Sequence, residues 1–143
     1  MEPTFRSSCP ISSALDIMGD KWTLLIIRDM MFGGKSTFKD FSNAQEKIAT
    51  GILASRLKRL VDLSLITKGT IPENKKTVVY SLTEKGIDLL PIVVELILWS
   101  DKQLRDHVNQ PMRELAKNIR KDKPKFIERY TRKLLSEISE RHK

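Results

Sequence analysis

The sequence predicts a mainly α-helical fold with one small β-hairpin, an α+β class. Apolar residues recur at helical spacing in several segments between residues 10 and 99. Residues 50–62 are predicted to form a short amphipathic helix with small polar and basic side chains on its outward side. Two strand-like segments follow, on either side of a basic loop at residues 72–76. A helix that fits a DNA groove, followed by a basic-tipped hairpin, is typical of a winged helix-turn-helix domain.

Length and charge set the domain organisation. The chain has 143 residues, 40% hydrophobic and 31% charged, which fits one folded domain with an appended arm. Residues 1–101 hold 13 Lys and Arg against 12 Asp and Glu, whereas residues 102–143 hold 13 against 6, so most of the net charge of +8 lies in the tail. We expect a DNA-binding and dimerisation domain over residues 1–110 and a basic helical extension over residues 111–143.

The N-terminal half contains three predicted helices. Pro10 suits the first position of a helix, and apolar residues follow it at helical spacing. Asp20 is a predicted N-cap for a buried helix over residues 21–30, which Gly33 and Gly34 end. Ser36 or Thr37 is expected to cap a short third helix over residues 38–42, whose two core-facing residues are Phe38 and Phe41.

The fourth predicted helix has two distinct faces. On a 3.6-residue wheel one arc is apolar and the opposite arc is polar. The apolar arc holds Leu53, Leu57, Leu60 and Val61, and the polar arc holds Gly51, Ser55, Lys58 and Asp62. Arg56 and Arg59 fall on the two flanks. The hairpin that follows has its second strand at residues 77–82, and Asn74, Lys75 and Lys76 form its predicted tip.

A long helix, capped by Thr83, is predicted from residue 84 to about residue 107. Its apolar residues spread around most of the circumference, more than one small core requires, so we expect a second copy of the chain to cover part of it. Trp22 and Trp99 could line a ligand pocket, but a core position is the favoured interpretation. The tail carries a further helical stripe from Phe126 to Ile138.

Several classes of protein are not expected. The single cysteine, Cys9, excludes an internal disulfide, and its distance from His107 and His142 argues against a zinc site. Asp16, Asp20 and Asp29 are better explained by capping and helix-surface charge than by a metal. No catalytic set or phosphate loop is recognisable, so neither an enzyme nor a cofactor is expected. The longest apolar run, residues 89–99, is too short to span a bilayer, and no signal peptide is recognisable, which favours a cytoplasmic protein.

A series of landmarks runs along residues 9–99. They are Cys9-Pro10, Ala14-Leu15, Gly19-Asp20-Lys21-Trp22, Leu24 to Asp29, Phe38 with Phe41, Ser55 to Leu60, Val79 to Gly86, Pro91 and Trp99. In the order and spacing of these landmarks the chain resembles the HxlR-type transcriptional regulators, winged helix-turn-helix proteins related in architecture to the MarR group. The resemblance implies a homodimer on a palindromic or pseudo-palindromic operator in double-stranded DNA, and we expect the dimer to be joined through its terminal helices. The chain departs from the family pattern at Thr37, Ala49 and Gly51, and the cap of the fourth helix is expected to pass from Ala49 to Thr50.

Two sets of candidate functional residues follow. The DNA-binding set is Thr50, Gly51, Ser55, Arg56, Lys58, Arg59, Asn74, Lys75 and Lys76. Cys9 is the candidate sensor of oxidants or electrophiles, because it lies near a helix N-terminus, where N–H groups and the positive end of the dipole favour a reactive thiolate. Each set has an alternative: the fourth helix could be an ordinary surface helix with a solvated basic face, the tip at Asn74 to Lys76 a solvated turn, and Cys9 a buried, inert residue. At the level of function, the alternative is a protein-interaction module without specific DNA binding.

Overall fold

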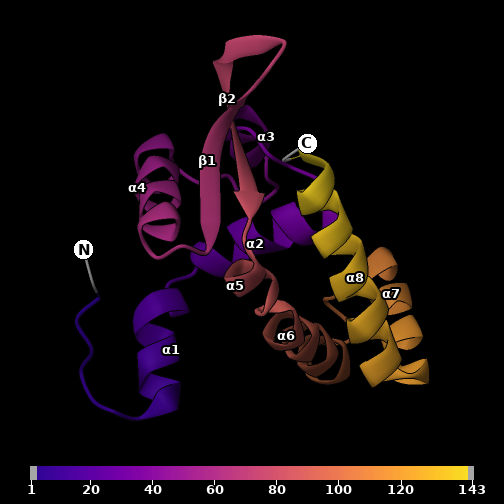
Figure 1. Cartoon of the computed structure of the whole chain (residues 1–143). Coiled ribbons are helices and arrows are strands. Elements are labelled where there is room, and N and C mark those ends of the chain that lie inside the picture. Colours follow the sequence, from indigo (N-terminus) through magenta and orange to yellow (C-terminus); the bar gives the residue numbers. More distant parts are fainter. Residues whose placement is uncertain (1–2, 142–143) are drawn as a thin grey trace. The chain divides into compact units, whose positions relative to one another are not determined.

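The computed structural model describes residues 3–141, which are mainly helical with one two-stranded antiparallel hairpin (Figure 1). The expected mainly helical α+β fold is confirmed. Two compact units are present, Met1–Gly86 and Ile87–Lys143. In chain order the elements are α1 (Pro10–Met18), α2 (Thr23–Phe32), α3 (Phe38–Ser42), α4 (Thr50–Asp62), β1 (Ile66–Ile71), β2 (Asn74–Leu82), α5 (Glu84–Ile87), α6 (Leu90–Gln103), α7 (Gln110–Lys121) and α8 (Lys123–Arg141).

The core of the first unit is built by α2, α3, α4 and the base of the hairpin. Ile26 and Ile27 of α2, Phe41 of α3 and the leucines of α4 are buried. The ring of Phe41 meets that of Tyr80 from β2 edge-on, with centroids 6.3 Å apart. Phe38 is only half-buried, so Phe41 alone contributes a buried ring from α3.

The predicted cap of α3 is confirmed at Thr37, whereas the predicted N-cap of α2 is wrong, because the N-cap residue is Trp22 and Asp20 lies two residues before it. Helix α2 begins at Thr23, two residues later than predicted, because Asp20 Oδ2 accepts hydrogen bonds from the backbone N–H groups of Trp22 and Thr23, both at 3.1 Å. Thr37 caps α3 in a capping box, in which its hydroxyl accepts from Asp40 N and the Asp40 carboxylate accepts from Thr37 N.

The hairpin pairs β1 with β2 from Ile66 opposite Leu82 to Ile71 opposite Asn74. Asn74 to Lys76, predicted as loop, belong to β2, and the turn is confined to residues 72–73. A register shift after Thr70 allows Ile71 to pair with Asn74, and the Asn74 side-chain amide donates to Thr77 Oγ1 at 2.8 Å. The strand therefore starts three residues earlier than its β-branched residues suggest.

The prediction of one continuous helix over residues 84–107 is wrong. The segment is divided into α5 and α6, and α6 ends at Gln103. Pro91 explains the break, since its ring would clash with the carbonyl of Ile87 in a continuous helix, whereas the first turn of a new helix tolerates its missing N–H.

The second unit packs α7 and α8 with α6. Ala116, Ile119 and Leu134 are buried in it. The apolar stripe predicted for the tail is confirmed as the inward side of α8, with Phe126 stacked on Tyr130 at 5.5 Å. Trp99, predicted as core, is 59% exposed, whereas Trp22 in the first unit is half-buried. Over residues 3–141, no helix combines the length and apolar character needed to cross a bilayer.

Candidate nucleic-acid interface

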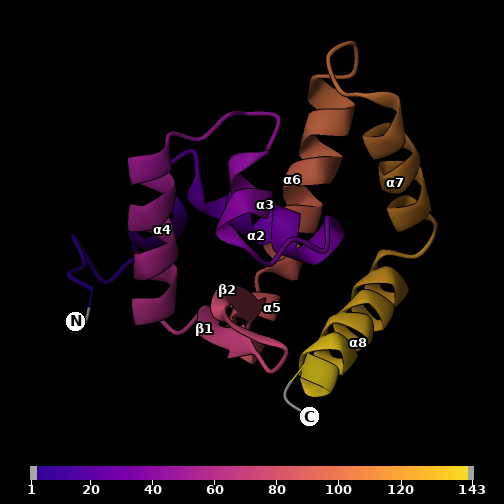
Figure 2. The same cartoon turned by 90° about the horizontal axis from the view of Figure 1, so that it is seen from above.

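Helix α4 has one buried and one open face, as predicted. Leu53, Leu57 and Leu60 are almost completely buried, and they attach the helix to the core of the first unit. The opposite face is exposed at Thr50, Gly51, Ser55, Lys58 and Asp62. Figure 2 shows α2 and α3 on one side of α4, so the polar face points away from them. The arrangement α3, turn, α4 is a helix-turn-helix whose second helix presents small polar and basic groups.

The N-terminal end of α4 has no side-chain cap. The N-cap residue is Ala49, and Thr50 is the first helical residue, so the expected transfer of the cap to Thr50 is wrong. Ala49 lies in extended backbone while its carbonyl already accepts from Leu53 N at 2.9 Å, which fixes the helix start one residue before the hydroxyl. A Cβ atom added at Gly51 would meet nothing within 4 Å. The backbone N–H groups of this end are therefore accessible to an anion such as a phosphate.

The two arginines of α4 are held by groups that precede α2. Arg56 Nε donates to Asp20 Oδ2 at 2.9 Å, and Arg59 Nη2 donates to the backbone oxygen of Asp16. Burial acts to raise the pKa of Asp20, but hydrogen bonds from Thr23 and Arg56 outweigh it and lower the pKa to about 2. Asp20 is thus ionised at neutral pH and joins the start of α2 to the middle of α4.

Lys58 differs from the arginines because it is free to reach outward. Its side chain is 77% exposed, and its ion pair with Asp62, 2.8 Å long, links positions i and i+4 on the surface of the helix. Exposed pairs of this kind contribute little to stability. The Lys58 ammonium can therefore exchange Asp62 for a phosphate or a base edge at small cost.

The hairpin lies beside α4 and supplies a second basic group. In Figure 1 its tip extends past the N-terminal end of α4. Asn74, Lys75 and Lys76 are all exposed near this tip. The Asn74 side-chain oxygen Oδ1 accepts from Lys76 N at 3.0 Å, which orients the backbone, while Lys75 and Lys76 themselves stay exposed. The hairpin has the position and charge of a DNA-contacting wing.

A tight contact fixes the base of the hairpin against the end of α4. Ser64, which follows the helix, has a left-handed backbone with φ of 60°, and the Thr83 hydroxyl donates to its carbonyl at 2.7 Å. A Cβ atom added at Gly86 would lie 2.2 Å from Leu65 O. Only glycine allows this approach of the backbone, and Gly86 is the last residue of the landmark run from Val79 to Gly86.

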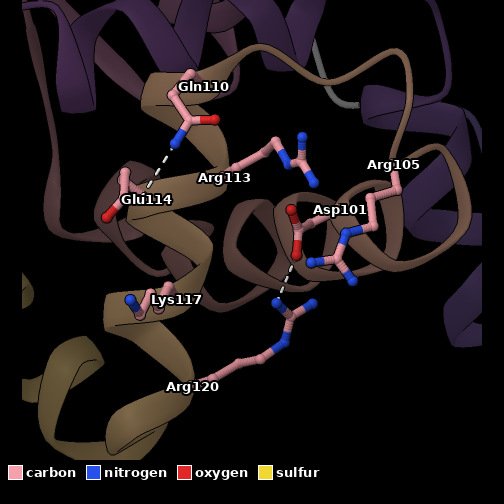
Figure 3. Close-up of a pocket in the computed structure, with 7 residues that line it drawn as sticks. All are labelled: Asp101, Arg105, Gln110, Arg113, Glu114, Lys117 and Arg120. Carbon is pink, nitrogen blue, oxygen red and sulfur yellow. Dashed lines mark hydrogen bonds and ion pairs between the residues drawn. The ribbon is translucent and has the colours of Figure 1, made fainter.

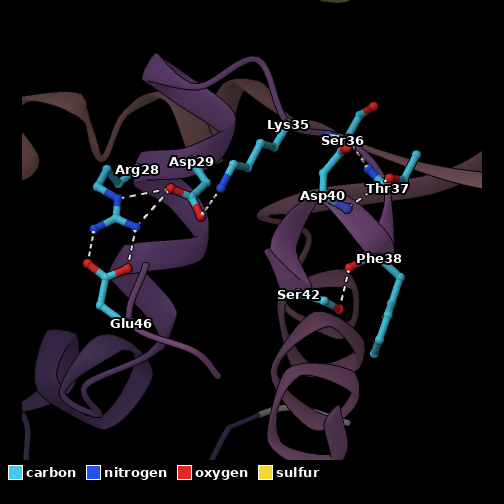
Figure 4. Close-up of polar contacts among 9 residues, drawn as sticks. All are labelled: Arg28, Asp29, Lys35, Ser36, Thr37, Phe38, Asp40, Ser42 and Glu46. Carbon is cyan, nitrogen blue, oxygen red and sulfur yellow. Dashed lines mark hydrogen bonds and ion pairs between the residues drawn. The ribbon is translucent and has the colours of Figure 1, made fainter. Parts of the chain in front are cut away.

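The turn between α3 and α4 is held by an ionic cluster that the sequence did not suggest (Figure 4). Arg28 of α2 donates to both carboxylate oxygens of Glu46, at 2.7 and 2.9 Å, and also contacts Asp29, which pairs with Lys35. The hydrogen bond from Arg28 lowers the pKa of Glu46 to about 2. This cluster fixes the path of the turn and hence the angle at which α4 leaves it.

A family model described as HxlR-like helix-turn-helix matches residues 17–108, well over half of the chain. The chain belongs to this family. The HxlR-like match contains the helix-turn-helix, the hairpin and α6, and it ends before α7.

Relatives of known sequence or structure agree with this assignment. The transcriptional regulator YodB of Bacillus subtilis is 36% identical over 98 residues, which span 68% of this chain and 87% of YodB. The solved structure of reduced YodB has a TM-score of 0.56 at 31% identity and covers 68% of this chain and 95% of that one. PA1607, solved as a candidate transcription factor, has a TM-score of 0.60 at 34% identity, covering 74% and 70%. YodB has also been solved after diamide treatment and with bound quinone.

Cys9 lies before the region matched by the HxlR-like model. It is the N-cap residue of α1 and is exposed, so the alternative of a buried cysteine is wrong for the single chain. Arg6, three residues before Cys9, forms an ion pair with Asp16. Within residues 3–141 no group of three potential ligands could hold a metal ion. His142 lies outside the described residues.

Proposed function

We propose that this protein is a homodimeric transcriptional regulator that binds double-stranded DNA sequence-specifically. The observation that carries the proposal is the division of α4 into two faces. Its leucines anchor it to the core, while its polar face stays open beside a basic hairpin. An exposed helix of this kind fits the major groove, and a hairpin beside it can follow the adjacent backbone. The regulatory role is supported by the relatives, which include the transcriptional regulator YodB.

The proposed DNA-binding residues divide into two roles. Thr50, Ser55 and Lys58 have side chains on the open face and are assigned to base edges or adjacent phosphates, and Gly51 lets the backbone approach the DNA closely. Arg56 and Arg59 are assigned to positioning α4, because their guanidinium groups are already bonded to Asp20 and to the backbone oxygen of Asp16. Their place on the flanks of α4 also assigns them to the phosphate backbone. Asn74, Lys75 and Lys76 are assigned to the backbone beside the groove. Phosphate contacts set the register of the protein, and base contacts provide the sequence preference.

A second copy of the chain is proposed to cover the open apolar faces of the terminal helices. Ile11 and Leu15 of α1 are 71% and 53% exposed, and α6 presents a stripe of Ile92, Leu96 and Trp99. Large apolar side chains gathered on one face indicate an interface. A two-fold dimer would place its α4 helices in successive major grooves about 34 Å apart, which requires a palindromic or pseudo-palindromic operator.

We propose that Cys9 makes DNA binding responsive to oxidants or electrophiles, by analogy with YodB, which was solved in diamide-treated and quinone-bound forms. Because Cys9 is the only cysteine of the chain, a disulfide would join two copies. Its formation would release two protons and two electrons to diamide, which is reduced to the hydrazine. With a quinone, the thiolate sulfur would instead attack a ring carbon to form a C–S bond, and the quinone oxygen would take up a proton, which gives a thioether-substituted hydroquinone. Both reactions need the exposed position that Cys9 occupies.

The direct test selects bound sequences from a random duplex pool and measures the affinity of the selected site against scrambled DNA at several salt concentrations. Lys58→Ala is expected to weaken specific binding by about 1 to 3 kcal/mol if it contacts a base, and to reduce the salt slope by about 1 if it contacts a phosphate. Lys102→Ala, which removes an equal charge in the second unit, is the matched control. Equal binding to all duplexes, unchanged by Lys58→Ala, would overturn the proposal.

Assignments of domains, location and activity complete the proposal. The first 110 residues form the DNA-binding and dimerisation part, and residues 111–143 form a basic helical extension, with the whole protein in the cytoplasm and without enzymatic activity or cofactor. The competing function is a protein-interaction module that retains the winged helix only for docking. That function would be favoured if a protein partner bound at the open face of α4 and no duplex showed a specific affinity.

A further inference from the structure

A charged cavity lies in the second unit, between the end of α6 and the outward side of α7 (Figure 3). Its volume is about 330 Å³, at the lower end of the range of small-molecule sites. Every described residue that lines it is polar or charged. The cations are Arg105, Arg113, Lys117 and Arg120, against the two carboxylates of Asp101 and Glu114. The cavity therefore has an excess of two positive charges.

The pairing inside the cavity leaves three cations available. Asp101 is only 7% exposed and pairs with Arg120, whose second guanidinium nitrogen donates to Leu98 O. The side chains of Arg105, Arg113 and Lys117 form no hydrogen bond or ion pair with another described residue. Figure 3 shows the guanidinium groups of Arg105, Arg113 and Arg120 gathered around Asp101. The carboxylate of Asp101 is paired with Arg120, so the positive charges of Arg105 and Arg113 are not neutralised by it.

Such a cluster favours an anion for two reasons. Like charges in a concave site repel each other more strongly than on an open surface, and an anion relieves this repulsion. Guanidinium groups also present paired N–H donors that match the oxygens of a phosphate or carboxylate. Two negative charges would neutralise the excess.

The cavity is separate from the surface proposed for dimerisation. Asp101 follows Ile92 by nine residues, which at 3.6 residues per turn places it on the opposite side of α6 from the stripe of Ile92, Leu96 and Trp99. A second copy seated on that stripe would leave the cavity open. Most of the cavity also comes from residues beyond position 108, outside the family match.

We propose that this cavity binds a small organic dianion, either a phosphomonoester or a dicarboxylate, with Arg105, Arg113 and Lys117 as the groups that hold it. The test uses the full-length protein without DNA, so it is independent of the proposed regulatory function. Isothermal titration calorimetry in low-chloride buffer is performed with phenyl phosphate, succinate and, as a monoanion of similar size, benzoate. One saturable site per chain is expected for at least one dianion, with binding at least tenfold tighter than that of benzoate.

Variants assign the binding to the cavity. Arg113→Gln and Arg105→Gln should each weaken the dianion by about 10- to 100-fold, because each removes a charge-assisted hydrogen bond worth roughly 1.5 to 3 kcal/mol. Arg129→Gln, an exposed arginine of α8 outside this cavity, removes the same charge and should change the affinity less than twofold. Circular dichroism checks that the variants fold. We expect that they do, because the replaced side chains hold no other part of the described structure in place.

The outcomes are distinct. Tighter binding of phenyl phosphate identifies the ligand class as phosphomonoesters, and tighter binding of succinate identifies dicarboxylates. Absence of saturable binding by the wild-type protein with both dianions at tens of millimolar would overturn the proposal. An equal loss of affinity in Arg113→Gln and Arg129→Gln would also overturn it, because it would show attraction to the overall charge of the chain rather than to this site.

Discussion

Asp20→Asn tests how strongly the start of α2 holds α4. The Asp20 carboxylate accepts from Trp22 N, Thr23 N, Thr23 Oγ1 and Arg56 Nε, and its pKa is lowered from 3.8 to about 2. At about 1.4 kcal/mol per pKa unit, the charge contributes at most about 2.5 kcal/mol to folding. Because 22% of the side chain is exposed to solvent, we expect about 1 to 2 kcal/mol.

The contribution of Asp20 to the free energy of unfolding should fall as the pH is lowered. A carboxylate with a lowered pKa stabilises the folded state fully above the unfolded pKa near 4, and this contribution is lost as the pH falls towards 2. The difference in unfolding free energy between wild-type protein and Asp20→Asn should therefore be largest at pH 7 and shrink between pH 4 and pH 2. Urea denaturation at fixed protein concentration measures it, since dimerisation would make stability concentration-dependent.

Controls separate the ion pair from general effects of charge. Asp62→Asn removes the exposed pair with Lys58 and should leave the unfolding free energy unchanged within error. In a double-mutant cycle, Asp20→Asn and Arg56→Gln should be coupled by about 0.5 to 2 kcal/mol at pH 7. If the two changes add independently, or if the cost of Asp20→Asn is the same at pH 2 and pH 7, then Asp20 does not hold α4 through its charge.

Four further changes test other parts of the structure. Gly86→Ala should destabilise the protein by about 1 to 3 kcal/mol in urea denaturation, because its Cβ would lie 2.2 Å from Leu65 O; an unchanged midpoint would contradict this contact. Leu96→Glu should convert the dimer to a monomer in analytical ultracentrifugation, and a wild-type protein that sediments as a monomer would refute the interface. Gly51→Ala should raise stability by up to about 1 kcal/mol while lowering operator affinity, whereas full affinity would mean that DNA does not approach this backbone. Cys9→Ser should abolish any effect of diamide or quinone on DNA binding; a persisting response would exclude Cys9 as the sensor.

Local periodicity predicted the parts of the fold that depend on local chemistry. Helix α4 was placed at its observed bounds, and its buried leucines were identified, because a 3.6-residue pattern directly reports one buried face. A short polar side chain before an apolar run predicted a cap at Ser36 or Thr37, and the structure has it at Thr37. The break at Pro91 was missed because the apolar pattern continues through it, although the ring excludes a continuous helix.

The support of the candidate interface was not predictable, because it joins residues far apart in the chain. Arg56 and Asp20 are separated by 36 residues, and Arg28 and Glu46 by 18. No periodic pattern links such positions, so the sequence assigned Arg56 to DNA alone, without its role in fixing α4. The open face of α4 was predictable for the opposite reason, since exposure follows from the helical wheel.

The separation of anchoring and open positions on α4 has a consequence for how such a protein can change its target. Thr50, Ser55 and Lys58 take no part in the core, so under the proposed function exchanges among them would alter which duplex is preferred while the buried leucines keep the subunit folded. A new specificity would then be reached by single substitutions that lower the affinity for the old site without lowering the stability of the fold. Grafting these few side chains between related subunits should transfer the choice of operator intact.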